Sequence, residues 1–114
     1  MSYKENRPWG SFENLLDADY CKVKQIIIHA GQSPSYQYHF KRSEVWVVVQ
    51  GEGELKLNDE ITSVGLGEII HVPVKAKHQI KNTGETDLIF IEVQVGDYFG
   101  EDDIVRLEDK YGRV

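Results

Sequence analysis

The sequence is poor in cysteine and has no long apolar stretch. Cys21 is the only cysteine among 114 residues, so no disulfide can form within the chain and a dithiol reaction is excluded. The longest wholly apolar runs, such as Val45 to Val49, are far too short to cross a bilayer, and the first ten residues lack the apolar core of a signal peptide. From these absences we expect a cytoplasmic protein.

Basic residues are also too few and too scattered to form a continuous stripe. The chain has 13 Lys and Arg against 19 Asp and Glu, which gives a net charge of −6. Nucleic acids and anionic membranes are bound through basic patches, so we expect neither as a partner. A chain of this length corresponds to one domain, and we expect a single domain over residues 1–114 with no room for a second catalytic one.

Short strand signals recur along the chain, whereas no long stretch has a helical period. Clusters of Gly, Pro, Asn and Asp, for example at 30–34 and 82–84, separate the strands. The expected strands are 23–29, 35–40, 44–50, 54–57, 68–72, 78–82 and 88–95. Such a pattern predicts an all-β fold, an antiparallel jelly-roll barrel with an N-terminal arm at 7–12 and a short C-terminal tail from Gly96 onward. Only 101–107 has a composition that allows a helix.

Four polar residues in the middle of the chain have the spacing of metal ligands. Gln37 and His39 are two residues apart, so in a strand their side chains share a face. Glu44 and His78 begin two further strands, and a barrel would bring these rows together. Two imidazoles, a carboxylate and an amide oxygen suit Zn²⁺, Mn²⁺, Fe²⁺, Co²⁺ or Ni²⁺, and without a thiolate the set selects none of them. The residues expected to follow inward are Trp46, Val48, Gln50, Ile80 and Asn82.

The same residues lie in two segments that resemble the paired signature of the cupin superfamily. The first half of that signature is matched by Gly31, Gln37, His39, Glu44 and Gly51, and the second half by Gly67, Pro73, His78 and Asn82. Gln37 stands where the signature has its first His, and Lys75 stands where it usually has Gly. The resemblance implies a double-stranded β-helix with a metal site inside the barrel.

Segments outside this signature are similar to the type II mannose-6-phosphate isomerase domain. They are Arg7-Pro8-Trp9-Gly10, residues 35–46, Ile91-Glu92-Val93-Gln94 and residues 96–113. In that family the metal ligands are of Gln, His, Glu and His type, with which Gln37 agrees. The domain is commonly the C-terminal part of a bifunctional enzyme whose N-terminal part is a mannose-1-phosphate guanylyltransferase. The Gly-rich nucleotide loop of that part is absent here, so we expect a stand-alone isomerase domain.

The resemblance implies a reaction, the isomerisation of mannose 6-phosphate to fructose 6-phosphate. A divalent metal, zinc first and then Mn, Co, Fe or Ni, would polarise the carbonyl and stabilise an enediolate while a base moves a proton. Glu92 is the candidate base, on its face parity and its place in the matching segment. Arg106 matches an arginine of the family's tail and is expected to contact the enediolate or the phosphate.

Three more residues are candidates for substrate binding. Lys75 and Arg42 are cationic residues near the expected mouth of the barrel, and Gln94 shares a face with Glu92. The family often has His where this chain has Phe40, Lys41 and Val45. Two alternatives therefore stay open, a non-catalytic cupin that binds a metal or a sugar, and an iron-dependent oxygenase that uses two histidines and one carboxylate.

Apolar residues expected on the outer faces of the sheets exceed what one small barrel can cover. They are Ile26, Ile28, Val45, Val47, Val49, Ile89 and Ile91. Cupins often pair through such a face, so we expect a homodimer whose ligand is a phosphorylated sugar.

Overall fold

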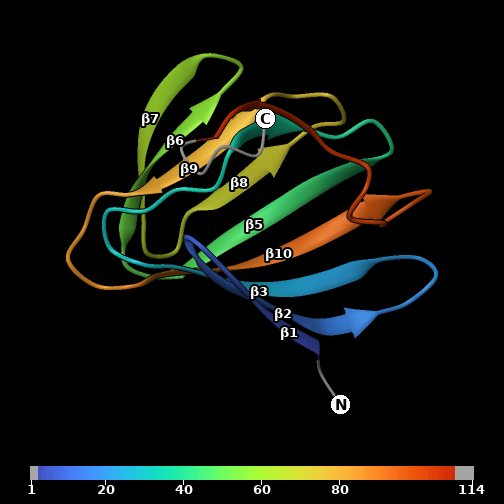
Figure 1. Cartoon of the computed structure of the whole chain (residues 1–114), viewed down its shortest axis with the longest axis horizontal. Helices are drawn as coiled ribbons and strands as arrows, with labels where there is room; N and C mark the ends of the chain where they lie inside the picture. Colours follow the sequence, from blue (N-terminus) through green and yellow to red (C-terminus); the bar gives the residue numbers. More distant parts are fainter. Residues whose placement is uncertain (1–2, 110–114) are drawn as a thin grey trace.

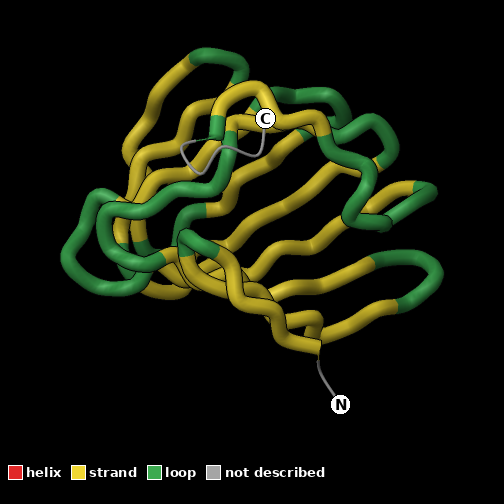
Figure 2. Tube along the Cα trace, in the orientation of Figure 1, coloured by secondary structure: helices red, strands yellow, loops and turns green. Residues whose placement is uncertain are grey.

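The computed structural model describes residues 3–109, which form strands and turns without a helix (Figure 1, Figure 2). In order, the strands are β1 (Tyr3–Arg7), β2 (Gly10–Asp17), β3 (Lys22–Ile28), β4 (Tyr36–Tyr38), β5 (Arg42–Gln50), β6 (Glu52–Leu57), β7 (Glu60–Gly65), β8 (Ile69–Val72), β9 (His78–Asn82), β10 (Leu88–Gly96) and β11 (Val105–Glu108). The all-β prediction is confirmed. Within the described range, no helix is long and apolar enough to span a membrane.

Two antiparallel sheets enclose the interior of the molecule. The six-stranded sheet has the order β1-β2-β3-β10-β5-β8, and the five-stranded sheet has the order β11-β4-β9-β6-β7. In Figure 1, β3, β10 and β5 lie side by side, while β6, β7 and β9 gather away from them. Because β10 pairs with both β3 and β5, the early, middle and late parts of the chain meet in one sheet.

Strand positions agree with the sequence pattern for β3, β4, β5, β6, β8, β9 and β10, and the pattern misses the other four. β1 and β2 form a hairpin where the sequence predicts only an arm. In β7 five of the six residues are partly or fully exposed, so the strand has little apolar alternation to reveal it. The tail strand β11 was expected to be part of a helix.

Inward rows of side chains on β3, β5, β9 and β10 carry both the core and the polar site. In β9 the predicted row is confirmed, since His78, Ile80 and Asn82 are at most 2% exposed. In β5, Trp46 and Val48 are buried as expected. The prediction that Gln50 follows them inward is wrong, because the pairing of β10 with β5 skips Val49 and Gln50 is exposed. A bulge of this kind breaks the alternation of faces.

The inward row of β3 corrects the expected outer face. Ile26 and Ile28 are 7% and 0% exposed, so they belong to the core and not to the outside. Strand parity explains the difference, because Lys24, Ile26 and Ile28 share one face and Ile27 lies on the other. The predicted outward positions of Val45, Val47, Ile89 and Ile91 agree with their partial exposure, and Val49 is 45% exposed.

The expectation of a helix at 101–107 is wrong. This segment forms a turn that leads into β11, which pairs with β4. The Asp103 carboxylate accepts the backbone N–H groups of Phe40 and Lys41, at 3.0 and 2.9 Å. Burial would raise the pKa of Asp103, but these two N–H groups outweigh it and hold the pKa below its usual value. Tertiary contacts therefore override a weak local helix preference.

Candidate metal centre and substrate cavity

A cavity of about 120 Å³ lies between the two sheets. Inward positions of the strands and the tail segment between β10 and β11 line it together. Among its lining residues are Lys24 of β3, Gln37 of β4, Glu44 of β5, His78 of β9, Glu92 of β10 and Arg106 of β11. The cavity thus gathers polar groups from six strands.

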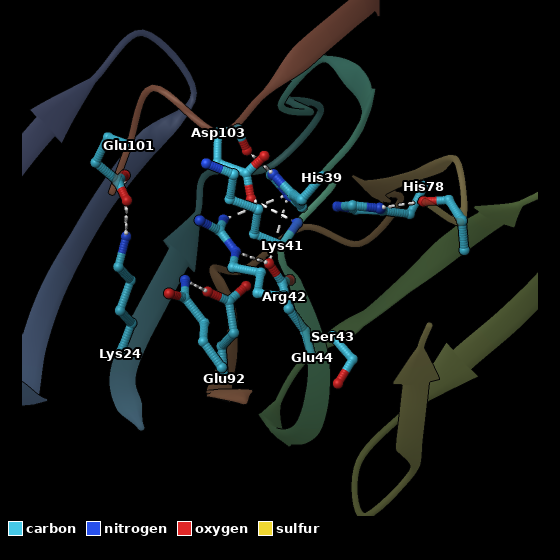
Figure 3. A network of polar contacts seen from close by, with 12 residues as sticks. Lys24, His39, Lys41, Arg42, Ser43, Glu44, His78, Glu92, Glu101 and Asp103 are labelled. Atoms are coloured by element: carbon cyan, nitrogen blue, oxygen red, sulfur yellow. Dashed lines mark hydrogen bonds and ion pairs between the residues drawn. The ribbon is translucent and has the colours of Figure 1, made fainter. Parts of the chain in front are cut away.

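Three buried side chains form a cluster at one wall of this cavity. One ligand atom from each of His39, Glu44 and His78 lies within 4.8 Å of the others. His39 Nε2 is 3.4 Å from Glu44 Oε2, and the two imidazole rings are 5.1 Å apart between centroids. Figure 3 shows both rings directed toward the Glu44 carboxylate region. The sequence motif thus brings together the three residues that could share a metal ion.

Both histidines are oriented by backbone carbonyl groups. His39 Nδ1 lies 2.6 Å from the carbonyl oxygen of Asp103, and His78 Nδ1 lies 3.0 Å from that of Ala76. A carbonyl only accepts, so each Nδ1 carries a proton, and in the neutral ring Nε2 then keeps the lone pair that a metal ligand requires. Burial lowers the pKa of His39 to about 4, which keeps its ring neutral at pH 7.

The Glu44 carboxylate supplies the negative charge of the cluster. Arg42 Nε donates to Oε2 at 2.8 Å and Trp46 Nε1 donates to Oε1 at 2.9 Å. Burial alone would raise the pKa of Glu44, but His78, Arg42 and His39 outweigh it and hold the pKa well below its usual range. Two imidazole nitrogens and one ionised carboxylate are a donor set that fits a divalent metal.

Arg42, expected to bind substrate, is placed inside this cluster. Its side chain is 7% exposed and lines the cavity. Besides Glu44, its guanidinium approaches His39 Nε2, at 3.3 Å. Arg42 therefore contacts two of the three atoms that a metal ion would use, and its charge balances that of Glu44.

Glu92 and Gln94 are both buried and their side chains meet, as their shared face predicts. Gln94 Nε2 donates to Glu92 Oε2 at 2.8 Å. Glu92 lines the cavity, whereas Gln94 is not among the lining residues and is 0% exposed. Burial, and then the negative charge of Glu44, raises the pKa of Glu92 to about 8. Gln94 is thus placed to orient Glu92.

The remaining candidates divide between the cavity and the surface. Gln37 and Arg106 both line the cavity, and in the sheet Gln37 pairs in register with His78 on one side and with Arg106 on the other. Lys75 is exposed and does not line the cavity, while its backbone N–H donates to the carbonyl of His39. The structure therefore separates Lys75 from the other candidates.

Sequence reasoning missed two residues of this region. Lys24 lines the cavity although it lies outside the motif segments, and its parity with Ile26 and Ile28 in β3 was the available signal. Asp103 holds the tail against the loop after β4. No local pattern predicts that contact, because it joins positions more than 60 residues apart.

Comparison with known families and structures agrees with this geometry. The family model described as "Mannose-6-phosphate isomerase C-terminal" matches residues 1–109. The mannose-1-phosphate guanylyltransferase ManC of Salmonella typhimurium is 42% identical over 108 residues, which cover 95% of this chain and 22% of the relative. The chain thus spans about a fifth of the length of this relative.

Solved structures support the fold. The capsular polysaccharide assembling protein CapF of Staphylococcus aureus matches with a TM-score of 0.79 and 26% identity, over 95% of this chain and 34% of that chain. The cupin domain of Schizosaccharomyces pombe Cnp3 matches with a TM-score of 0.74 and 17% identity, over 76% and 64% of the two chains. The second likeness shows the fold alone, and it confirms the double-stranded β-helix of the cupins.

Proposed function

The chain belongs to the mannose-6-phosphate isomerase C-terminal family, and from this premise we propose that it is a metal-dependent isomerase converting mannose 6-phosphate to fructose 6-phosphate. The observation that carries the proposal is the buried cluster of His39, Glu44 and His78 beside a carboxyl group of raised pKa. Relatives named for mannose-1-phosphate guanylyltransferase support a role in making a polysaccharide precursor. In that pathway a guanylyltransferase activity would act after the isomerisation.

The metal site of this proposal consists of His39, Glu44 and His78, with the amide oxygen of Gln37 as fourth ligand. Gln37 is supported by its place on the cavity wall and its register with His78. A bound divalent ion, zinc first and then Mn, Co, Fe or Ni, would supply Lewis acidity toward the carbonyl and hydroxyl oxygens of the sugar. The carbonyls of Asp103 and Ala76 keep the two imidazoles in the required tautomer.

Glu92 is the proposed proton carrier. An aldose and a ketose differ by one proton moved between C1 and C2 and another moved between their oxygens, so one group must take a proton and return it. A carboxyl group with a pKa of about 8 exchanges protons with little cost near neutral pH. Gln94 holds the side chain through its amide, which limits the rotamers of Glu92.

Arg106 is the proposed partner for charge that develops on the sugar oxygens. It stands beside Gln37 across the β11–β4 pairing, which places it at the end of the cavity that holds the metal cluster. A guanidinium keeps its charge throughout the reaction and offers a planar pair of donors. Such a donor stabilises an anionic intermediate more than the neutral sugar.

The test of this proposal is proton transfer at the sugar. Metal-loaded protein is incubated with mannose 6-phosphate in D₂O, and NMR follows fructose 6-phosphate and deuterium at C1 and C2. We expect the parent to form product and the rate of product formation to fall at least a hundredfold in Glu92→Gln. Glu54→Gln, at an exposed position of β6, is the matched control and should keep the rate of the parent. Formation of product at the parent rate by Glu92→Gln would remove Glu92 from the role of base.

A second candidate function is a binding module without turnover, and the placement of Arg42 favours it. The guanidinium already donates to Glu44 and approaches His39 Nε2. A cation of the protein itself therefore already contacts two of the atoms that a metal ion would use. In this case the parent would bind a sugar phosphate and produce neither fructose 6-phosphate nor deuterium exchange. An iron-dependent oxygenase would instead consume oxygen when the Fe²⁺-loaded protein is incubated with the same sugar phosphate.

We also propose that the chain forms a homodimer through the outer face of the larger sheet. Outward residues pair in register across β5 and β10, with Val47 opposite Ile91 and Val45 opposite Val93. The apolar surface continues onto β8, where Ile69 is 64% exposed and stands opposite Val47. A second copy could cover this face with the same residues, as a two-fold contact requires.

A further inference from the structure

We propose that Lys24 and Arg7 form an anion subsite that binds the phosphate of the substrate, and that Glu101 fills this subsite until the phosphate displaces it. The identity of the ligand as a sugar phosphate rests on the function proposed above. The subsite itself is a binding site, so it can be tested without turnover.

Lys24 is a buried cation inside the barrel. It stands on the inward row of β3, its side chain is 4% exposed, and it lines the cavity. Its Nζ lies 3.0 Å from each carboxylate oxygen of Glu101 and 4.2 Å from the centroid of the Phe12 ring. A buried ammonium group is costly unless an anion accompanies it. The site is thus built for a negative partner.

Glu101 is an exchangeable partner. It belongs to the tail segment between β10 and β11, and its side chain is 47% exposed. Figure 3 shows its carboxylate reaching down from the tail to the Lys24 ammonium, apart from the Arg42 and His39 group. A half-exposed carboxylate on a loop can return to water, provided that another anion takes its place beside the buried ammonium group. The buried lysine, in contrast, stays in place.

Arg7 supplies the second positive charge. It lines the same cavity at the end of β1, and its guanidinium carbon lies 5.5 Å from the centroid of the Phe12 ring that Lys24 also contacts. It pairs with Glu5, and about a third of its side chain is exposed. Lys24 and Arg7 therefore both lie over the Phe12 ring, at the β1–β2–β3 side of the cavity. Two cations offer a phosphate dianion more charge-assisted hydrogen bonds than one cation does.

The size of the cavity supports displacement of Glu101. At about 120 Å³ it is smaller than the roughly 300 Å³ at which ordinary ligand sites begin. Removing the Glu101 side chain from Lys24 would enlarge the cavity on the side away from the metal cluster. A phosphorylated hexose could then extend from the cluster to Lys24.

The subsite is connected to the proposed base. Lys24 and Glu92 are register partners across β3 and β10, and both point into the cavity. Side chains at such positions begin about 5 Å apart. Phosphate held at Lys24 would therefore fix the sugar against the strand that carries Glu92, while the cluster holds the other end.

The experiment compares three ligands on the metal-loaded chain by calorimetry, namely fructose 6-phosphate, fructose and inorganic phosphate. We expect Lys24→Met to weaken fructose 6-phosphate binding at least tenfold and to leave fructose binding unchanged. Lys56→Met is the matched control, because Lys56 also lies over an aromatic ring, 4.3 Å from the centroid of Tyr36, and does not line the cavity. We also expect inorganic phosphate to bind the parent in competition with fructose 6-phosphate and to bind Lys24→Met more weakly. This result would show that Lys24 binds the phosphate group itself.

Glu101→Gln provides an independent test at an exposed position. Without its negative charge the side chain competes less for Lys24, so we expect fructose 6-phosphate to bind the variant severalfold more tightly than the parent. Unchanged affinity in both Lys24→Met and Glu101→Gln would overturn the subsite. If fructose 6-phosphate binds through Lys24 and is not isomerised, only the proposed function is contradicted. If Lys24→Met isomerises mannose 6-phosphate with the KM of the parent, only the subsite is contradicted.

Discussion

Lys75 has a left-handed backbone conformation, with φ of 67°, in the turn before His78. A residue with a Cβ pays about 1–2 kcal/mol for this conformation, and glycine does not. This explains physically why the related motif usually has Gly at this position. Gly51, another glycine of the motif, also has a positive φ, of 85°. A Cβ there would in addition lie 2.8 Å from the carbonyl oxygen of Asp87.

Replacing Lys75 by Gly should therefore stabilise the protein. The relief of strain exceeds the extra entropy that glycine gives to the unfolded chain, so we expect a gain of about 0.5–1 kcal/mol in the free energy of unfolding. Urea denaturation measures it. Lys81→Gly, on β9 and without positive φ, should lose stability. A destabilised Lys75→Gly would show that the side chain makes a contact that outweighs the strain.

At the scale of single residues, spacing in the sequence predicted which side chains point inward wherever the strand is regular. Gln37, His39, Glu44 and His78 all line the cavity as their motif predicts. The alternation of faces failed at Gln50, because a bulge interrupts it. It was not applied to Lys24, because a charged residue is rarely expected in the interior, although Lys24 shares the inward face of Ile26 and Ile28.

At the scale of elements, the tail segment before β11 connects the cluster of His39, Glu44 and His78 to the C-terminal part of the chain. The Asp103 carboxylate binds the N–H groups of Phe40 and Lys41, and its carbonyl accepts from His39. The sequence predicted strands from their local alternation and therefore missed this segment, whose conformation depends on contacts distant in sequence. The same reason explains the false expectation of a helix there.

Asp103→Ala should weaken metal binding by about tenfold or more, because the carbonyl that orients His39 loses its anchor. Competition with a chelator of known affinity measures the change. Asp97→Ala, exposed at the start of the same segment, is the control and should bind metal as the parent does. Unchanged metal affinity in a folded Asp103→Ala variant would show that His39 is held by other contacts.

At the scale of the whole molecule, the chain presents two different faces of the larger sheet. The inner face carries the polar site, and the outer face is apolar at Val45, Val47, Ile91 and Val93 of β5 and β10 and at Ile69 of β8. Large exposed apolar faces often mark sites of association, which is the basis of the proposed dimer. Sequence composition predicted the excess of apolar residues, although it assigned Ile26 and Ile28 to the wrong face.

Sedimentation at micromolar concentration should give a dimer for the parent and a monomer for Ile91→Lys. The substitution buries a charge at the centre of the proposed interface, which costs far more than the contact gains. Ile61→Lys is the matched control, because Ile61 is 60% exposed on β7 of the other sheet. A parent that sediments only as a monomer would overturn the dimer.

The catalytic role of the metal cluster is the central claim, and one measurement tests it most directly. Metal-free protein is reconstituted with Zn²⁺, Mn²⁺, Co²⁺ or Fe²⁺, and conversion of mannose 6-phosphate to fructose 6-phosphate is followed in the parent and in His78→Ala. We predict one bound ion per chain and turnover in the parent, with both lost in His78→Ala. Turnover that persists in His78→Ala, or a parent that binds no metal, would contradict the account.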